Sequence, residues 1–243
     1  MSPETSYPVG EVPVFGVAQA VAIFNQILDA AVPLVEVVGE VANFKVNQGK
    51  WVFFDLKDQE CLLSCFMPAY QLRVAVEDGM RVQVLARPNV TKWGKFSLTV
   101  QSIRPVGKGS IKKSFELLRQ KLADEGLFDD ERKRALPYLP QHIGVISSVD
   151  AAGYRDFIKI ITARLGGLRI DVISTLVQGA EAPDQIIAAI RQFNQLADPP
   201  EVLAIIRGGG SRDDLVAFDD ERLVRTIAAS RIPTIVGVGH EID

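Results

Sequence analysis

The chain has 243 residues, of which 47% are hydrophobic and 23% are charged, and its formal net charge is −3 at pH 7. This is the composition of a globular protein with room for one large or two ordinary domains, and Cys61 and Cys65 are too few for a disulfide framework or a structural zinc site. No run of about eighteen apolar residues occurs and Met1-Ser-Pro-Glu-Thr5 does not resemble a secretory signal, so we expect a cytoplasmic protein with no membrane contact.

Residues 1–32 are expected to form a lead-in and one helix. The first part is rich in proline and reads as irregular. Apolar residues then recur at helical spacing between Phe15 and Ala31, and Pro33 ends the helix or follows it closely.

From residue 33 the hydrophobic period changes to two residues, which is typical of strands. Five short strands in about seventy residues fit a small Greek-key barrel, and the OB-fold is the commonest barrel of that size. We therefore expect an OB-fold domain over residues 33–106. Its strands are predicted at Leu34–Phe44, Trp51–Lys57, Cys61–Met67, Met80–Arg87 and Phe96–Arg104.

Aromatic residues lie among basic residues in this predicted barrel. A groove for single-stranded nucleic acid needs aromatic faces on which bases stack and cations that neutralise phosphates. Phe54 and Phe66 are expected to fill the barrel instead, and packing inside the barrel is the alternative for the two tryptophans. The DNA-binding candidates are Lys45, Lys50, Trp51, Lys92, Trp93 and Lys95.

The charge distribution is compatible with this assignment. From Val35 to Lys113 there are 12 Lys and Arg against 7 Asp and Glu, a net +5, whereas the remaining residues carry 15 against 23, a net −8. A basic stretch in an acidic protein suits a surface that binds a polyanion. A solvated surface of mixed charge explains it equally well.

A connecting helix and linker are expected over residues 107–140. Ser110 is predicted to cap a helix that runs to Phe128, and Gly126 suits its C-terminal position. Pro137 and Pro140 mark the boundary to the next domain.

Strands and helices then alternate over residues 141–243. Apolar, β-branched strands that alternate with helices predict a parallel sheet covered on both faces. The whole chain is therefore expected to be multi-domain, an all-β OB-fold barrel followed by an α/β domain. The predicted strands are Ile143–Ser147, Arg169–Leu176, Val202–Ile206 and Thr234–Val238, and the predicted helices are Ala152–Leu165, Pro183–Leu196 and Asp213–Ala229.

A run of glycines follows the third of these strands, in Arg207-Gly208-Gly209-Gly210-Ser211. Consecutive glycines let the backbone approach a ligand closely and direct its N–H groups at it, and an anion is favoured where such a turn enters a helix. We predict that Gly208, Gly209, Gly210 and Ser211 bind a phosphate, with Arg207 beside it as a bidentate clamp. A merely tight connection is the alternative.

Ligands of parallel sheets bind beyond the carboxyl ends of the strands. Asp156, Arg207 and His240 are expected to meet there. His240 could serve as a general base or acid in phosphodiester cleavage, because the ordinary pKa of histidine lies near neutrality. Asp156 or Asp243 could orient His240 or the attacking water.

The order of several motifs resembles the exodeoxyribonuclease VII large-subunit family. The resemblance extends from about Val35 to the end of the chain. Its catalytic part is carried by Arg207–Ser211, Ala217–Glu221, Ser230–Pro233 and Gly239–Asp243, its connector by Lys121–Phe128 and Lys133–Pro137, and its OB domain by Val38–Phe44, Phe54–Asp58 and Pro105–Gly109.

The resemblance implies hydrolysis of phosphodiester bonds in single-stranded DNA, working inward from its ends. The family's essential positions correspond to Asp156, Arg207, His240 and Asp243. The resemblance also implies that no cofactor is required and that a divalent metal is dispensable, so no metal ligands are assigned. Full-length relatives are expected to assemble with several copies of a small subunit.

Two features depart from the family pattern. Ser148-Val-Asp-Ala-Ala-Gly153 replaces the usual Ser-Pro-Thr-Gly-Ala-Ala, and the sequence stops at Asp243 where the family continues. We therefore expect this chain to bind single strands and to cleave them poorly. The alternative is a single-stranded DNA-binding module with a truncated, inactive nuclease domain. A nucleotide-dependent α/β enzyme is a third class, but the P-loop and dinucleotide-binding patterns are missing from the sequence.

Overall fold

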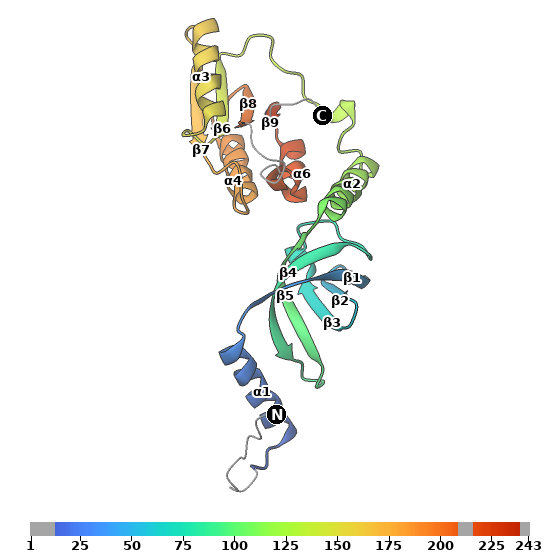
Figure 1. Ribbon diagram of the computed structural model, residues 1–243. Coiled ribbons are helices and arrows are strands. Elements are labelled where there is room, and N and C mark those ends of the chain that lie inside the picture. Colours follow the sequence, from blue (N-terminus) through green and yellow to red (C-terminus); the bar gives the residue numbers. More distant parts are fainter. Residues whose placement is uncertain (1–12, 209–215, 239–243) are drawn as a thin grey trace. The chain divides into compact units, whose positions relative to one another are not determined.

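A computed structural model describes residues 13–208 and 216–238 (Figure 1). The chain divides into two compact units. One unit contains the residues up to 72 together with 77–106, and the other contains 73–76 and the residues from 107 onward.

The first unit is a helix followed by a closed five-stranded barrel. The strand order around the barrel is β1-β2-β3-β5-β4, in which β3 and β5 run parallel and the other neighbours antiparallel. A closed Greek-key barrel of five strands is the OB-fold, so the predicted barrel is confirmed. The elements are α1 (Val17–Ala31), β1 (Val35–Asn47), β2 (Trp51–Lys57), β3 (Leu62–Pro68), the 3-10 turn η1 (Ala69–Gln71), β4 (Arg81–Val90) and β5 (Phe96–Pro105).

The strand period determines which aromatic rings enter the barrel. Phe54 is buried as predicted, between inward-facing Val52 and Leu56. The prediction for Phe66 is wrong, because its neighbours Cys65 and Met67 point inward and Phe66 therefore lies half-buried on the outer face.

The second unit begins with α2 (Lys108–Asp124), followed by the 3-10 turn η2 (Asp130–Arg132). The predicted cap at Ser110 is wrong. The backbone N–H of Ile111 already donates to the carbonyl of Gly107, so the helix starts earlier, with Gly107 as its cap residue and without a side-chain cap. Gly126 has φ 70° just past the helix end, where a residue without Cβ is favoured.

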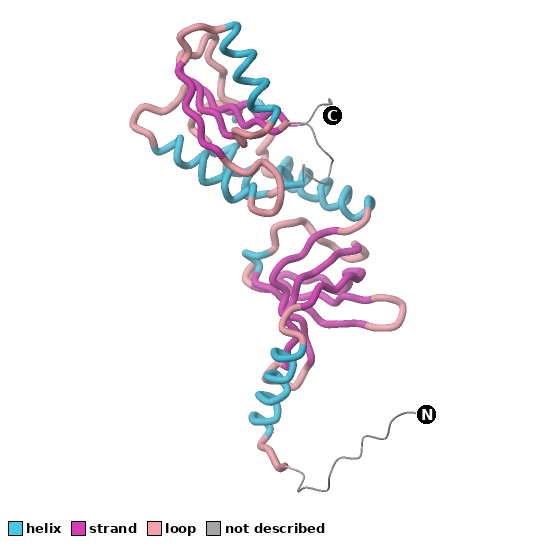
Figure 2. Tube along the Cα trace, turned by 60° about the vertical axis from the view of Figure 1, so that its left-hand side comes forward, coloured by secondary structure: helices cyan, strands magenta, loops and turns pink. Residues whose placement is uncertain are grey.

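In the part of this unit that the structure describes, four parallel strands in the order β7-β6-β8-β9 form one sheet. Figure 2 shows its strands in magenta. On one face, Phe157 and Ile161 of α3 pack against Val145 and Ala204. The other face carries α4 and α6, so the predicted α/β arrangement with a parallel sheet is confirmed. The elements are β6 (His142–Ser147), α3 (Ala152–Arg164), β7 (Arg169–Ser174), α4 (Ala182–Gln195), β8 (Val202–Arg207), the 3-10 turn η3 (Val216–Asp219), α6 (Glu221–Ala229) and β9 (Thr234–Val238).

The last helix is shorter than the predicted Asp213–Ala229. Asp220 has an extended backbone conformation, and its carboxylate accepts a hydrogen bond of 2.8 Å from the backbone N–H of Arg222. An aspartate in this role caps a new helix, so α6 begins at Glu221. Within the two described ranges, every helix is too short or too polar to cross a membrane.

Candidate nucleic-acid interface and catalytic edge

Hydrogen bonds fasten three strand ends together at the carboxyl edge of the parallel sheet. The Ser147 hydroxyl, at the end of β6, donates to the carbonyl of Ile206 in β8 over 2.8 Å. The backbone N–H of Thr175, after β7, donates to the carbonyl of Ser147 over 3.0 Å. These bonds hold the ends of β6, β7 and β8 beside one another.

Two glycines bring the first turn of α3 against the end of β8. A Cβ atom placed on Gly153, in the first turn of α3, would lie 2.9 Å from the backbone nitrogen of Gly208. The first N–H groups of any α-helix have no intrahelical acceptor. α3 starts at Ala152, and no side-chain cap accepts from these groups. A helix N-terminus of this kind carries partial positive charge beside the Gly208 turn.

Arg207 ends β8 at this edge and is only 3% exposed. Its Nη1 donates to the carbonyl of Gly208 over 2.8 Å. A guanidinium keeps its charge when buried, and a charge acts more strongly in a medium of low dielectric constant.

Asp156 lies on α3, exposed and one helical turn after Gly153. Residues three apart on a helix are neighbours on its surface, so Asp156 is placed near the Gly153–Gly208 contact. Of the other predicted catalytic and phosphate-binding residues, Gly209, Gly210, Ser211, His240 and Asp243 lie outside the described residues.

Thr175 also lies at this edge, and the sequence analysis did not identify it as a candidate site residue. Its side chain is buried, and its hydroxyl forms no hydrogen bond with any residue that the structure describes. The predicted strand Arg169–Leu176 includes Thr175, whereas β7 ends at Ser174, so the sequence pattern did not place this threonine at the edge.

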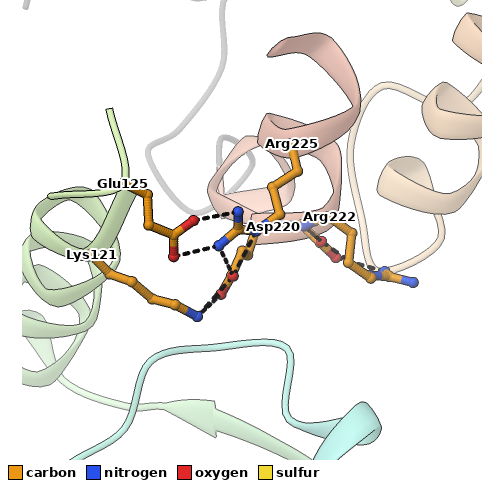
Figure 3. A network of polar contacts seen from close by, with 6 residues as sticks. Lys121, Glu125, Asp220, Arg222 and Arg225 are labelled. Carbon is orange, nitrogen blue, oxygen red and sulfur yellow. Dashed lines mark hydrogen bonds and ion pairs between the residues drawn. The ribbon is translucent and has the colours of Figure 1, made fainter. Parts of the chain in front are cut away.

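Glu221, part of a motif that carried the resemblance, belongs to a network of ion pairs between α2 and α6. Figure 3 labels its partners Lys121, Glu125 and Arg225. Lys121 Nζ donates to its carboxylate over 2.8 and 2.9 Å, and Arg225 bridges it to Glu125 over 2.6 to 2.9 Å. Burial alone would raise the pKa of Glu221, but the hydrogen bonds from Lys121 and Arg225 outweigh it and hold the pKa below its ordinary value. The contacts of Glu221 are thus those of a structural residue that joins two helices.

On the barrel, Trp51 lies on the outer face together with two aromatic residues, Phe53 and Phe66, that were not predicted to bind DNA. Trp51 and Phe53 are each 45% exposed on the outer face of β2. Their ring centroids lie 6.2 and 6.4 Å from that of Phe66 on β3. Lys45 of β1 is paired with Phe53, and Lys50 directly precedes Trp51. We call Trp51, Phe53 and Phe66 the aromatic platform.

The second group of DNA-binding candidates lies in the turn between β4 and β5. Trp93 is 79% exposed, and Lys92 Nζ lies 5.0 Å from the centroid of its ring. The backbone N–H of Lys95 donates to the Thr91 hydroxyl and closes the turn. Both tryptophans are therefore available for stacking, and the alternative of core packing is wrong for them.

The structure does not bring the two groups together. The antiparallel register pairs Val35, the first residue of β1, with Ala86, so the turn after β4 lies beyond the beginning of β1. The turn that precedes Trp51 lies at the other end of β1. The aromatic platform and the Trp93 turn are thus two separate contact regions of one barrel.

Among the residues that the structure describes, no group of three or more His, Cys, Asp or Glu side chains is placed to hold a metal ion.

Comparison with known proteins identifies both units. Residues 127–243 match the family model "Exonuclease VII, large subunit", and residues 15–104 match "OB-fold nucleic acid binding domain". A chain in a solved structure of a replication protein A heterotrimer bound to ssDNA was also matched, with 16% identity over 39% of this chain and 72% of that chain, but its TM-score of 0.27 is too low to bear on the fold.

Three curated relatives are each named exodeoxyribonuclease 7 large subunit. The protein of Clostridium acetobutylicum is 39% identical over 86% of this chain and 53% of its own length, and that of Thiobacillus denitrificans is 39% identical over 100% and 54%. The protein of Campylobacter hominis is 34% identical over 90% and 57%. The chain spans about half the length of the curated relatives it matches. The chain is therefore similar to exodeoxyribonuclease VII large subunits across both of its units, as its motifs predicted.

Proposed function

We propose that this chain binds single-stranded DNA through its barrel and hydrolyses phosphodiester bonds from DNA ends at the carboxyl edge of its α/β sheet. The observation that carries the proposal is the backbone contact between Gly153 and Gly208. It joins α3, which carries Asp156, to the end of β8, which carries Arg207, in a chain whose relatives are named exodeoxyribonucleases.

The chemistry of the edge supports phosphate binding. The uncapped first turn of α3 and the buried guanidinium of Arg207 both contribute positive potential beside the Gly208 turn. In phosphoryl transfer, catalysis consists mainly of positioning and of stabilising charge on the phosphoryl oxygens. We assign the phosphate contact to this edge and general acid–base catalysis to His240, oriented by Asp156 or Asp243.

The barrel supplies the binding function. Stacked bases gain about 1–3 kcal/mol each on aromatic side chains, and lysines neutralise the backbone. The aromatic platform with Lys45 and Lys50 offers both elements on one face, and the Trp93 turn with Lys92 and Lys95 offers a second contact.

The cleavage test uses single-stranded DNA labelled at one end and incubated with the chain in EDTA, with and without the small subunit of a full-length relative. We expect oligonucleotide products in EDTA, because the family resemblance implies a reaction without divalent metal. The variant His240→Ala is expected to abolish them. Cleavage only after addition of a divalent metal would contradict the metal-independent part of the proposal.

Binding without any cleavage would leave the single-stranded DNA-binding module as the function of this chain. Cleavage that appears only with the small subunit would assign to the complex an activity that the chain lacks alone. For the family as a whole, we also propose assembly with small subunits and a cytoplasmic location.

The binding test separates the two contact regions. Trp51→Ala and Trp93→Ala are each expected to weaken binding of single-stranded DNA by about tenfold, the loss of roughly one stacked base. Tyr138→Ala, which removes a fully exposed aromatic residue of the other unit, is the control and should leave the dissociation constant unchanged. An unchanged affinity of Trp51→Ala would contradict the assignment of the aromatic platform.

A further inference from the structure

Beside the aromatic platform lies a small network of polar side chains to which sequence reasoning gave no role. Asp55 is two residues beyond Phe53 on the same outer face of β2, and it is paired with Ser64 just as Phe53 is paired with Phe66. Residues two apart on a strand are separated by about 7 Å, roughly the width of a stacked base. A base on Phe53 would therefore place its edge over Asp55.

The Asp55 carboxylate is held by two hydrogen bonds. Its Oδ1 accepts from the Ser64 hydroxyl over 2.9 Å, and its Oδ2 accepts from Asn43 Nδ2 over 2.8 Å. Both partners are exposed and Asp55 is half-buried, so a ligand can reach all three.

A β-bulge aims Asn43 at this carboxylate. The register of β1 and β2 shifts between Ala42 and Lys45, and Asn43 has a positive φ of 55°. Asparagine tolerates this conformation better than most residues, and bulges commonly redirect a side chain. The carboxylate of Asp78 accepts a hydrogen bond of 2.8 Å from the backbone N–H of Phe44 and fastens the bulge.

The network presents acceptors to an incoming ligand. Each carboxylate oxygen has a further lone pair after its one bond inside the network, so two adjacent acceptors remain on Asp55. An isolated carboxylate on a DNA-binding face repels phosphates, which makes a contact with a base edge the favourable use of this group.

We propose that Phe53, Phe66 and Asp55 form a base-reading subsite that prefers guanine in single-stranded DNA. The inference rests on the proposed binding function of the barrel. Guanine carries two adjacent donors, N1–H and N2–H₂, which match two adjacent acceptors. Thymine has a single N–H between two carbonyl oxygens that the carboxylate repels, so it is disfavoured.

The test compares dissociation constants by fluorescence anisotropy at one salt concentration. Three labelled oligonucleotides of about twelve residues are used, the length of a typical OB-fold site. One contains thymidine alone, one alternates thymidine with deoxyguanosine, and one alternates thymidine with deoxyinosine, which lacks the 2-amino donor of guanine. A gel run after each titration checks that the oligonucleotides are uncut.

We expect the guanine-containing strand to bind about fivefold or more tightly than the thymidine strand, the lower end for one paired base contact. The inosine strand should lose a large part of that preference. Asp55→Asn should reduce the preference to less than about twofold, while affinity for thymidine stays equal or rises, since a negative charge is removed. Glu36→Gln is the control, because it removes an exposed acid elsewhere on β1 and should leave the preference intact.

Equal affinity of the unaltered chain for the thymidine and guanine strands would overturn the inference and leave the proposed binding function standing. So would a guanine preference that survives in Asp55→Asn. The comparison of the guanine and inosine strands uses the unaltered chain, so it tests the contact with the 2-amino group even if Asp55→Asn unfolds the bulge. Failure to bind any of the three strands would overturn the proposed binding function and the subsite with it.

Discussion

A Cβ atom placed on Gly153 would lie 2.9 Å from both the Cα and the nitrogen of Gly208, closer than real Cβ contacts come. The first turn of α3 and Gly208, the residue after β8, therefore touch through their backbones. Ser148–Gly153 departs from the family pattern, which has alanine at the last position, and in this chain the contact with Gly208 leaves no room there for a Cβ atom. The contact brings the segment of Asp156 to that of Arg207.

Gly153→Ala should displace one of these two segments, since backbone atoms cannot move aside as a flexible side chain would. We expect a loss of about 1–3 kcal/mol in the free energy of unfolding, the usual cost of overpacking, and a larger proportional loss of nuclease activity. Chemical denaturation and cleavage of end-labelled DNA measure the two effects. Gly166→Ala is the matched control, because its Cβ would meet nothing within 4 Å. Full activity of Gly153→Ala would show that the contact is not needed for catalysis.

Arg207→Ala is expected to abolish cleavage and to leave binding of single-stranded DNA within about twofold, because the barrel lies in the other unit. Loss of one charge-stabilising donor typically costs a factor of 100 to 1,000 in rate, roughly. Arg207→Lys should remain impaired, since lysine keeps the charge but lacks the planar fork. Arg164→Ala, which alters an exposed arginine at the end of α3, serves as the control in both assays. A parallel fall in binding and cleavage would contradict the assignment of binding to the barrel and of cleavage to the α/β unit.

The Glu221 network predicts a dependence of stability on pH. The pKa of Glu221 in the folded chain lies below its ordinary value of 4.5, so the unfolded chain binds a proton more readily. The stabilisation is present above pH 4.5 and is lost as the pH falls through the folded-state pKa. Glu221→Gln should therefore lower the free energy of unfolding by about 1 kcal/mol at neutral pH, and its difference from the unaltered chain should narrow in acid.

Denaturation with urea near neutral pH and in acid tests whether the difference in the free energy of unfolding narrows as the pH falls. Glu116→Gln is the control, since its ion pair with Lys112 lies 58–70% exposed on one helix. Such a pair contributes at most about 0.5 kcal/mol. A difference between Glu221→Gln and the unaltered chain that widens in acid would refute the assignment.

The two thiols should react at very different rates. Burial raises the pKa of Cys65 to about 12, so almost no thiolate forms there at neutral pH, whereas Cys61 is exposed. Titration of the folded chain with a thiol-specific disulfide reagent should modify one cysteine rapidly and the second only in denaturant. Cys61→Ser should remove the rapid phase, and a rapid phase that persists would show that the barrel opens at Cys65.

The sequence predicted the architecture because the two units differ in hydrophobic period. Alternation at every second residue indicated the barrel, and apolar strands separated by helical segments indicated the parallel sheet. Local capping was less predictable. The chain starts α2 at Gly107 and not at Ser110, and Asp220 interrupts a helical pattern to begin α6.

By itself, the sequence determined the fold class and the family resemblance, because motif order and residue period are properties of the chain alone. Only the tertiary structure decided which residues meet. The inward direction of Cys65 and Met67 places Phe66 outside with Trp51 and Phe53, since side chains alternate along a strand. The bulge at Asn43 and the Gly153–Gly208 contact depend on register and on close approach between distant segments, which no local pattern specifies.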